Sequence, residues 1–118
     1  MTHEELKGRL QHALNIAGNL HTLEDILDAI NAGKMQSFAE GDTWCVTQIE
    51  QYPRRKVLDI VYVVGDINEV DAGYRRIIDF ACAQGCSIIR AYGRIGWSKF
   101  LRERGWEPQS ILFHKEID

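Results

Sequence analysis

The most constraining feature of the sequence is an almost continuous apolar run followed closely by a helical pattern and a second apolar run. Residues 57–64 (VLDIVYVV) predict a strand buried on both faces, as at the centre of a sheet. Asn68 can cap a helix that carries an apolar stripe and ends at Gly85, and residues 87–92 predict the next strand. A strand, helix and strand this close together form a right-handed parallel crossover.

Two helices and two strands are predicted before this unit. Thr2 and Thr22 each stand three residues before an acidic residue, a spacing typical of a helix start, and an apolar stripe follows each. Residues 35–39 and 43–50 then flank a turn-rich Glu-Gly-Asp tripeptide, which predicts two antiparallel strands.

The end of the chain predicts a short helix over residues 97–104 and a last strand over residues 110–117, antiparallel and at a sheet edge. The resulting fold class is α/β (α+β). It has two N-terminal helices, an antiparallel strand meander, one right-handed βαβ crossover, a short helix and a C-terminal strand on a mixed sheet. The 118 residues are enough for one domain and too few for two, so we expect a single domain, 1–118.

Composition excludes several classes of protein. The formal net charge of −3 argues against nucleic acid as a partner, because neutralising phosphates needs a basic surface. The sequence has no apolar run long enough for a membrane span. The three cysteines, with no secretory leader, indicate reduced thiols in a cytoplasm. Cys82 and Cys86 have no histidine cluster nearby, so we expect no metal site.

Residues 80–106 (FACAQGCSIIRAYGRIGWSKFLRERGW) resemble part of the GNAT acetyltransferase family. Gly85 ends the helix, a strand and a short helix follow, and Gly105-Trp106 matches the family's Gly-aromatic pair. The order of elements resembles the family over nearly the whole chain and implies a GNAT-like fold. The chain also resembles small GNAT-like proteins of tailed phages and prophages, which implies a bacterial host cytoplasm or a virion as its location.

Two departures from the family concern its acyl donor. GNAT proteins hold acetyl-CoA with an Arg/Gln-x-x-Gly-x-Gly/Ala loop, where this chain has acidic Asp66, Glu69 and Asp71 and no glycine pair. Each like-charge contact with a phosphate costs on the order of 1 kcal/mol. The family's tyrosine acid falls at Leu101, which donates no proton. We therefore expect no cofactor and no catalytic residue at the usual positions, and no acetyl-CoA at the usual site.

Three functions remain open. The first is a non-catalytic binding or structural protein, a virion component or assembly factor, whose partner is another virion protein or a second copy of itself. The alternative is a divergent N-acyltransferase that uses acetyl-CoA, with Tyr62, Tyr92 and Asp59 as acid and base candidates. The third is a nucleic-acid-associated protein that uses the basic stretch of residues 75–104.

The string Gly-Arg-Ile-Gly-Trp at residues 93–97 is a candidate binding surface, with tight packing of Trp97 as the other interpretation. The side chains expected on this surface are Arg94, Trp97, Arg90 and Lys99. Asp59 interrupts the apolar central strand, and a structural pair with Arg90 is its expected role. The four histidines are scattered, which favours surface or capping roles. The predicted buried core is Val61, Val63, Ile77, Ile78, Ala81 and Ile89.

Overall fold

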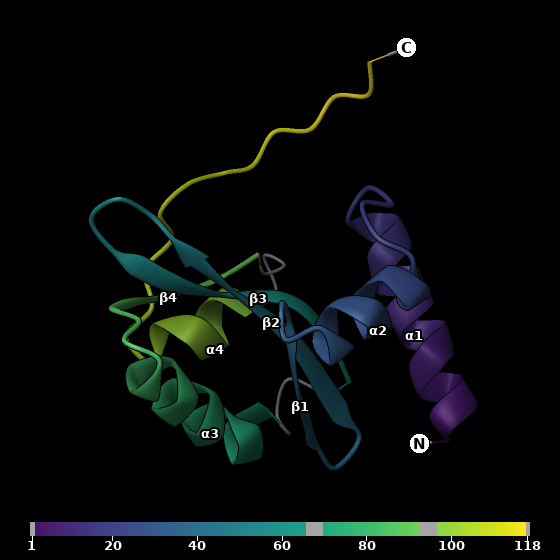
Figure 1. Cartoon of the computed structure of the whole chain (residues 1–118), viewed down its shortest axis with the longest axis horizontal. Coiled ribbons are helices and arrows are strands. Elements are labelled where there is room, and N and C mark those ends of the chain that lie inside the picture. The colour runs from purple at the N-terminus through teal and green to yellow at the C-terminus, as the bar shows by residue number, and fades with distance from the viewer. Residues whose placement is uncertain (1, 66–69, 93–96, 118) are drawn as a thin grey trace.

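The computed structural model describes residues 2–65, 70–92 and 97–117, and it contains helices on both faces of one sheet (Figure 1). In chain order the elements are α1 (His3–Ile16), α2 (Leu23–Asn31), β1 (Gln36–Glu40), β2 (Thr43–Gln51), β3 (Lys56–Val64), α3 (Val70–Ala83), β4 (Ile88–Ala91) and α4 (Ser98–Arg102). Among the described residues, no helix is long and apolar enough to cross a membrane.

The four strands form one mixed sheet in the order β1-β2-β3-β4. β1 pairs antiparallel with β2, and β2 pairs antiparallel with β3. β3 and β4 are parallel neighbours on either side of α3 in the sequence, so the predicted crossover is confirmed. An antiparallel pairing of these two strands would have excluded the expected fold.

The threonines predicted at the helix starts cap them in the structure. The hydroxyl of Thr22 accepts the backbone N–H of Asp25 at 3.1 Å, and the Asp25 carboxylate accepts the Thr22 N–H at 2.9 Å. Thr2 likewise accepts the N–H of Glu5 at 3.1 Å. Each contact satisfies a donor that the first helical turn leaves unpaired, which fixes where the helix begins.

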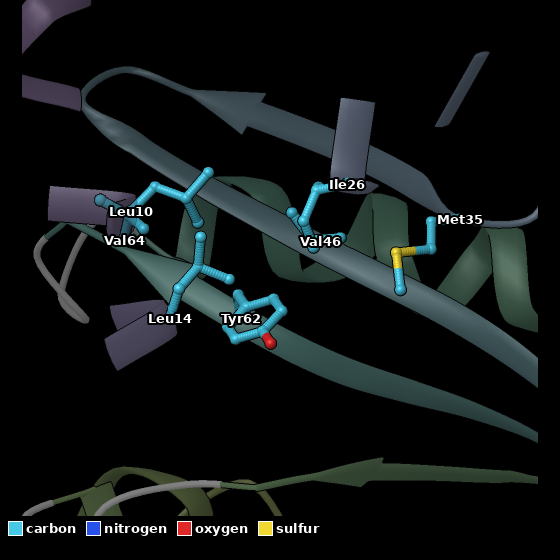
Figure 2. Packing of buried hydrophobic residues seen from close by; sticks show 7 residues of the cluster. All are labelled: Leu10, Leu14, Ile26, Met35, Val46, Tyr62 and Val64. Atoms are coloured by element: carbon cyan, nitrogen blue, oxygen red, sulfur yellow. The ribbon is translucent and has the colours of Figure 1, made fainter. Parts of the chain in front are cut away.

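The sheet separates two apolar clusters. On one face α1 and α2 pack on β2 and β3 through Leu10, Leu14, Ile26, Met35, Val46, Tyr62 and Val64 (Figure 2). On the other face Ile77 and Ala81 of α3 pack against Cys45, Leu58 and Ile60 of the sheet. β3 contributes to both clusters, as expected of a strand buried on both faces.

The predicted core is only partly correct. Ile77 and Ala81 are buried as expected. Ile78 and Ile89 are half-buried, because Ile89 lies on the edge strand β4 and Ile78 lies beside the buried stripe of α3. Val61 and Val63 are also half-buried, because both line a cavity described below.

The prediction of a last strand over residues 110–117 is wrong. These residues form no helix or strand, and Figure 1 shows the chain extending away from the sheet after α4. Their alternating apolar pattern suits a strand, but a strand also needs a neighbouring backbone, which the fold of one chain does not place beside them. The expected cap Asn68 lies outside the described residues.

Candidate functional site

The site lies where β3 and β4 separate. Their parallel pairing covers Val57–Ile60 of β3 and ends at Ile60 and Ala91, and β3 continues to Val64 paired with β2 alone. A cavity of about 500 Å³ opens at this fork. Crevices beyond the carboxyl ends of parallel strands are the usual ligand sites of such sheets, because the diverging chain leaves space there.

The wall of the cavity is mostly apolar. α1 and the turn after it supply Ala13, Ile16, Ala17 and Leu20, and β3 supplies Val61 and Val63. Other points of the wall supply polar side chains, among them His21, Gln48, Asp59 and Tyr62. An apolar pocket with a few convergent polar groups is the usual composition of a small-molecule site.

A β-bulge in β3 determines which side chains reach the cavity. Tyr62 pairs with Val46 of β2 and Ile60 pairs with Thr47, so Val61 between them has no partner in β2. The extra residue reverses the alternation of faces: Ile60 packs on the α3 side, whereas Val61 and Tyr62 both pack on the α1 side. Without the bulge, Tyr62 would point into the opposite cluster.

The Tyr62 hydroxyl forms a polar pair with His21. Its oxygen is 2.9 Å from Nδ1 of His21, which lies in the link between α1 and α2. The Tyr62 side chain is only 5% exposed, and burial raises the pKa of its phenol, which therefore stays protonated at neutral pH. Figure 2 shows the ring beside Leu14, with its oxygen pointing away from the labelled aliphatic side chains.

Asp59 is held in an ion pair at the base of the fork. Arg90 of β4 donates from Nε to Oδ1 at 2.7 Å and from its terminal nitrogen to Oδ2 at 3.0 Å. Tyr52 also accepts a hydrogen bond from Arg90 at 3.0 Å, and its ring lies against the guanidinium. The predicted pairing of Asp59 with Arg90 is confirmed. Because the guanidinium engages both oxygens of the carboxylate, we assign Asp59 a structural role.

The remaining predicted site residues do not gather at one surface. Tyr92 and Trp97 both line the cavity, Tyr92 exposed and Trp97 half-buried. Lys99 is exposed on α4, and Arg90 is engaged by Asp59 and Tyr52. Arg94 lies outside the described residues, so its proposed part in a binding surface stays a prediction.

Several bases of the 75–104 stretch have acidic partners within the chain. Arg76 contacts Glu40 at 2.9 Å, and Arg75 contacts Asp79 at 3.2 Å. These contacts reduce the positive surface that nucleic-acid binding would need. Within residues 2–65, 70–92 and 97–117, no cluster of three histidine, cysteine or acidic side chains could hold a metal ion.

His21 is the site residue that sequence reasoning missed. The sequence predicts a surface or capping role for it, because no cysteine or serine stands at a spacing that suggests a catalytic dyad. Its partner Tyr62 is 41 residues away, and only the packing of α1 and α2 on the sheet brings them together. No local sequence pattern predicts that this histidine contacts Tyr62.

Solved structures show what fold this arrangement represents. An acetyltransferase of Trypanosoma brucei superposes with a TM-score of 0.68 over 98% of this chain and 96% of its own, at 14% identity. A probable acetyltransferase gives 0.66 over 100% and 94%, at 11% identity. A possible acetyltransferase of Clostridium difficile gives 0.57 over 98% and 91%, at 12% identity.

The chain has a GNAT-type fold. This is a likeness of fold alone, because the identities are far below the level at which an activity carries over. No family model and no curated protein matches the sequence.

The described residues leave open, apolar space at the fork where β3 and β4 separate. Val61, in the wall of this space, pairs with no residue of β2 or β4. Such a bulge residue is a candidate to meet an acyl group, because its backbone groups are not committed to the ladder. The segment that would meet the diphosphate, residues 66–69, lies outside the described residues.

Proposed function

We propose that this GNAT-fold chain is a divergent acyltransferase, in which the fork between β3 and β4 holds the acyl end of a thioester beside an amine acceptor. One observation carries the proposal. The bulge at Val61 turns the Tyr62 hydroxyl toward the cavity side of the sheet, where it meets His21 at 2.9 Å. A phenol and an imidazole in contact at a part-buried position beside an apolar cavity are typical of sites that move protons.

The two side chains can hold the proton that the reaction releases. A bound thioester supplies an activated acyl group. Tyr62 can take a proton from the amine nitrogen while its own phenol proton passes to Nδ1 of His21. The proton can then return through Tyr62 to the departing sulfur, which leaves the pair in its original state. The products are an amide and a thiol, and Tyr62 replaces the acid missing at Leu101.

Enzyme assays on Tyr62→Phe test this proposal. The substitution removes the hydroxyl and keeps the ring, so the fold should remain while acyl transfer falls by a factor of about 100 or more, the usual contribution of a positioned acid or base. Tyr92→Phe is the matched control, because Tyr92 also lines the cavity but is 60% exposed. A Tyr62→Phe variant with unchanged turnover would remove Tyr62 from the mechanism.

A non-catalytic binding protein is the second candidate. The acidic residues 66–71 and the leucine at position 101 support it, because they stand where the family's phosphate loop and acid belong. A phage origin and a role in the virion rest only on the resemblance of the sequence. A chain that binds thioesters in the cavity without transferring the acyl group, or that binds none of them, would favour this candidate.

A further inference from the structure

The opening of the cavity between β3 and β4 is surrounded by exposed apolar side chains. Ile16 at the end of α1 is 61% exposed, Leu20 in the link to α2 is 71% exposed, and Tyr92 after β4 is 60% exposed. All three line the cavity. Contact of large apolar side chains with water is unfavourable, so a group of them around one opening favours a ligand with an apolar surface.

The inner wall combines small aliphatic side chains with aromatic rings. Ala13 and Ala17 stand four residues apart at the end of α1, so both lie on the same side of the helix. The half-buried ring of Trp97 forms another part of the wall, next to the rim residue Tyr92 in the list of aromatic groups there. Apolar and aromatic walls hold a ring through buried area and through ring contacts. The wall therefore suits an aromatic ligand.

The charges of the cavity do not suit a cationic ligand. In the described part of its wall, Asp59 is the one acidic side chain, and both of its oxygens are engaged by Arg90. An ammonium group that entered would lose its hydration without gaining a carboxylate as its partner, which is costly. This arrangement favours an amine in its uncharged form.

The uncharged form is also the one that acyl transfer needs. The lone pair of the amine nitrogen attacks the thioester carbonyl, and an ammonium group has no such lone pair. The carbon–nitrogen bond forms and the carbon–sulfur bond breaks. The proton that the nitrogen gives up passes through the pair of Tyr62 and His21 to the departing sulfur, as in the transfer proposed above.

We propose that the acceptor is a small primary amine on an aromatic body, which the cavity holds by that body and binds uncharged. The inference rests on the proposed function, because it names the class of amine that the transfer would use. The rim and the wall bind the aromatic body, and the Tyr62–His21 pair meets the nitrogen. A polyamine would instead bring several ammonium groups that have no partner in the described wall.

Calorimetric titration without an acyl donor tests this recognition with phenethylamine, phenethyl alcohol and spermidine. Between about pH 7 and pH 9 phenethylamine should bind about tenfold more tightly for each unit of pH, because the uncharged fraction of an amine with a pKa of ~10 grows by that factor. Phenethyl alcohol has no charge to lose, so its affinity should not change with pH. Spermidine should show no binding at millimolar concentration.

The variant Leu20→Glu places a carboxylate at the opening. Because Leu20 is exposed, the fold should remain. Phenethyl alcohol should bind the variant about tenfold more weakly, and spermidine should gain measurable binding. Leu27→Glu is the matched control, because Leu27 is an exposed apolar residue of α2 that does not line the cavity. No binding of either phenethyl ligand, an affinity for phenethylamine that is independent of pH, or unchanged binding in Leu20→Glu would each overturn the inference.

Acyl-transfer assays with the same amines separate this inference from the proposed function. Transfer to phenethylamine and none to spermidine would support both. Faster transfer to spermidine than to phenethylamine would overturn the inference and leave the proposed function standing. Binding of phenethylamine as described, with no transfer to any amine, would support the aromatic recognition and overturn the proposed function.

Discussion

At the scale of single residues, the Asp59–Arg90 pair holds the base of the fork together. Asp59 is 3% exposed and depends on Arg90, whose side chain is 39% exposed. Arg90→Ala leaves a buried carboxylate with no cation. We expect the free energy of unfolding to fall by roughly 1–3 kcal/mol. This is less than the loss for a fully buried pair, because solvent reaches Arg90 and weakens the interaction.

Urea denaturation at neutral pH measures this loss. The double variant Asp59→Asn with Arg90→Ala is the control, because it removes the charge as well as its partner and should recover part of the stability. A loss below about 0.5 kcal/mol in Arg90→Ala, which is typical of a surface site, would show that the pair is not structural.

Cys45 provides a second prediction at this scale. It is buried in β2, and burial raises the pKa of its thiol from 9.0 to about 11. The unfolded chain loses this proton near pH 9, so the folded state holds more protons above that pH. Stability should therefore fall as the pH rises from about 9 to about 11. Comparing the pH dependence of unfolding with that of Cys45→Ala measures the contribution, which should be absent from the variant.

Part of this site can be predicted from the sequence. Tyr62 is a possible substitute for the acid missing at Leu101, and Asp59 is a charge in an apolar strand that needs a partner. The bulge at Val61 could not be predicted, because no glycine or proline marks it in the sequence. His21 depends on the docking of two helices on the sheet, which is a property of packing rather than of local pattern.

At the scale of elements, α3 shows which face of a helix supports the sheet. Ile77 is 2% exposed and packs against the sheet, whereas Ile78 is half-buried. Ile77→Ala should cost about 2–5 kcal/mol, the range for a buried isoleucine. Ile78→Ala should cost clearly less. Thermal and urea denaturation of the two variants compare adjacent positions of the same helix, and equal losses would show that α3 is rotated from this position.

The elements that sequence predicted correctly are those with local signals. Thr2 and Thr22 predict where the first two helices begin. The apolar run of β3 and the apolar stripe of α3 predict the parallel crossover. The strand predicted at residues 110–117 failed, because alternation specifies a shape and not the neighbour that the backbone must pair with.

At the scale of the whole molecule, the GNAT-type fold favours a thioester as the acyl donor, whereas the charge of residues 66–71 disfavours the diphosphate of acetyl-CoA. The proposed acyl site lies in an open, apolar fork, but residues 66–71 supply three carboxylates and no glycine pair. If the cavity alone holds the donor, its nucleotide part contributes little to binding. The acyl group and the thioester arm would then carry most of the affinity.

Binding of acetyl-CoA and of acetyl-pantetheine, which lacks the nucleotide, should therefore differ little. We expect dissociation constants within about threefold of each other, or about 0.6 kcal/mol. Thermal shifts with both donors measure this, since a ligand at a hundred times its dissociation constant adds about 2.7 kcal/mol to stability. The variant Asp66→Gly with Glu69→Gly removes two carboxylates and should bind acetyl-CoA more tightly, with acetyl-pantetheine unchanged. Acetyl-CoA bound more than tenfold tighter by the unmodified chain would instead mean that residues 66–71 hold the diphosphate despite their charge.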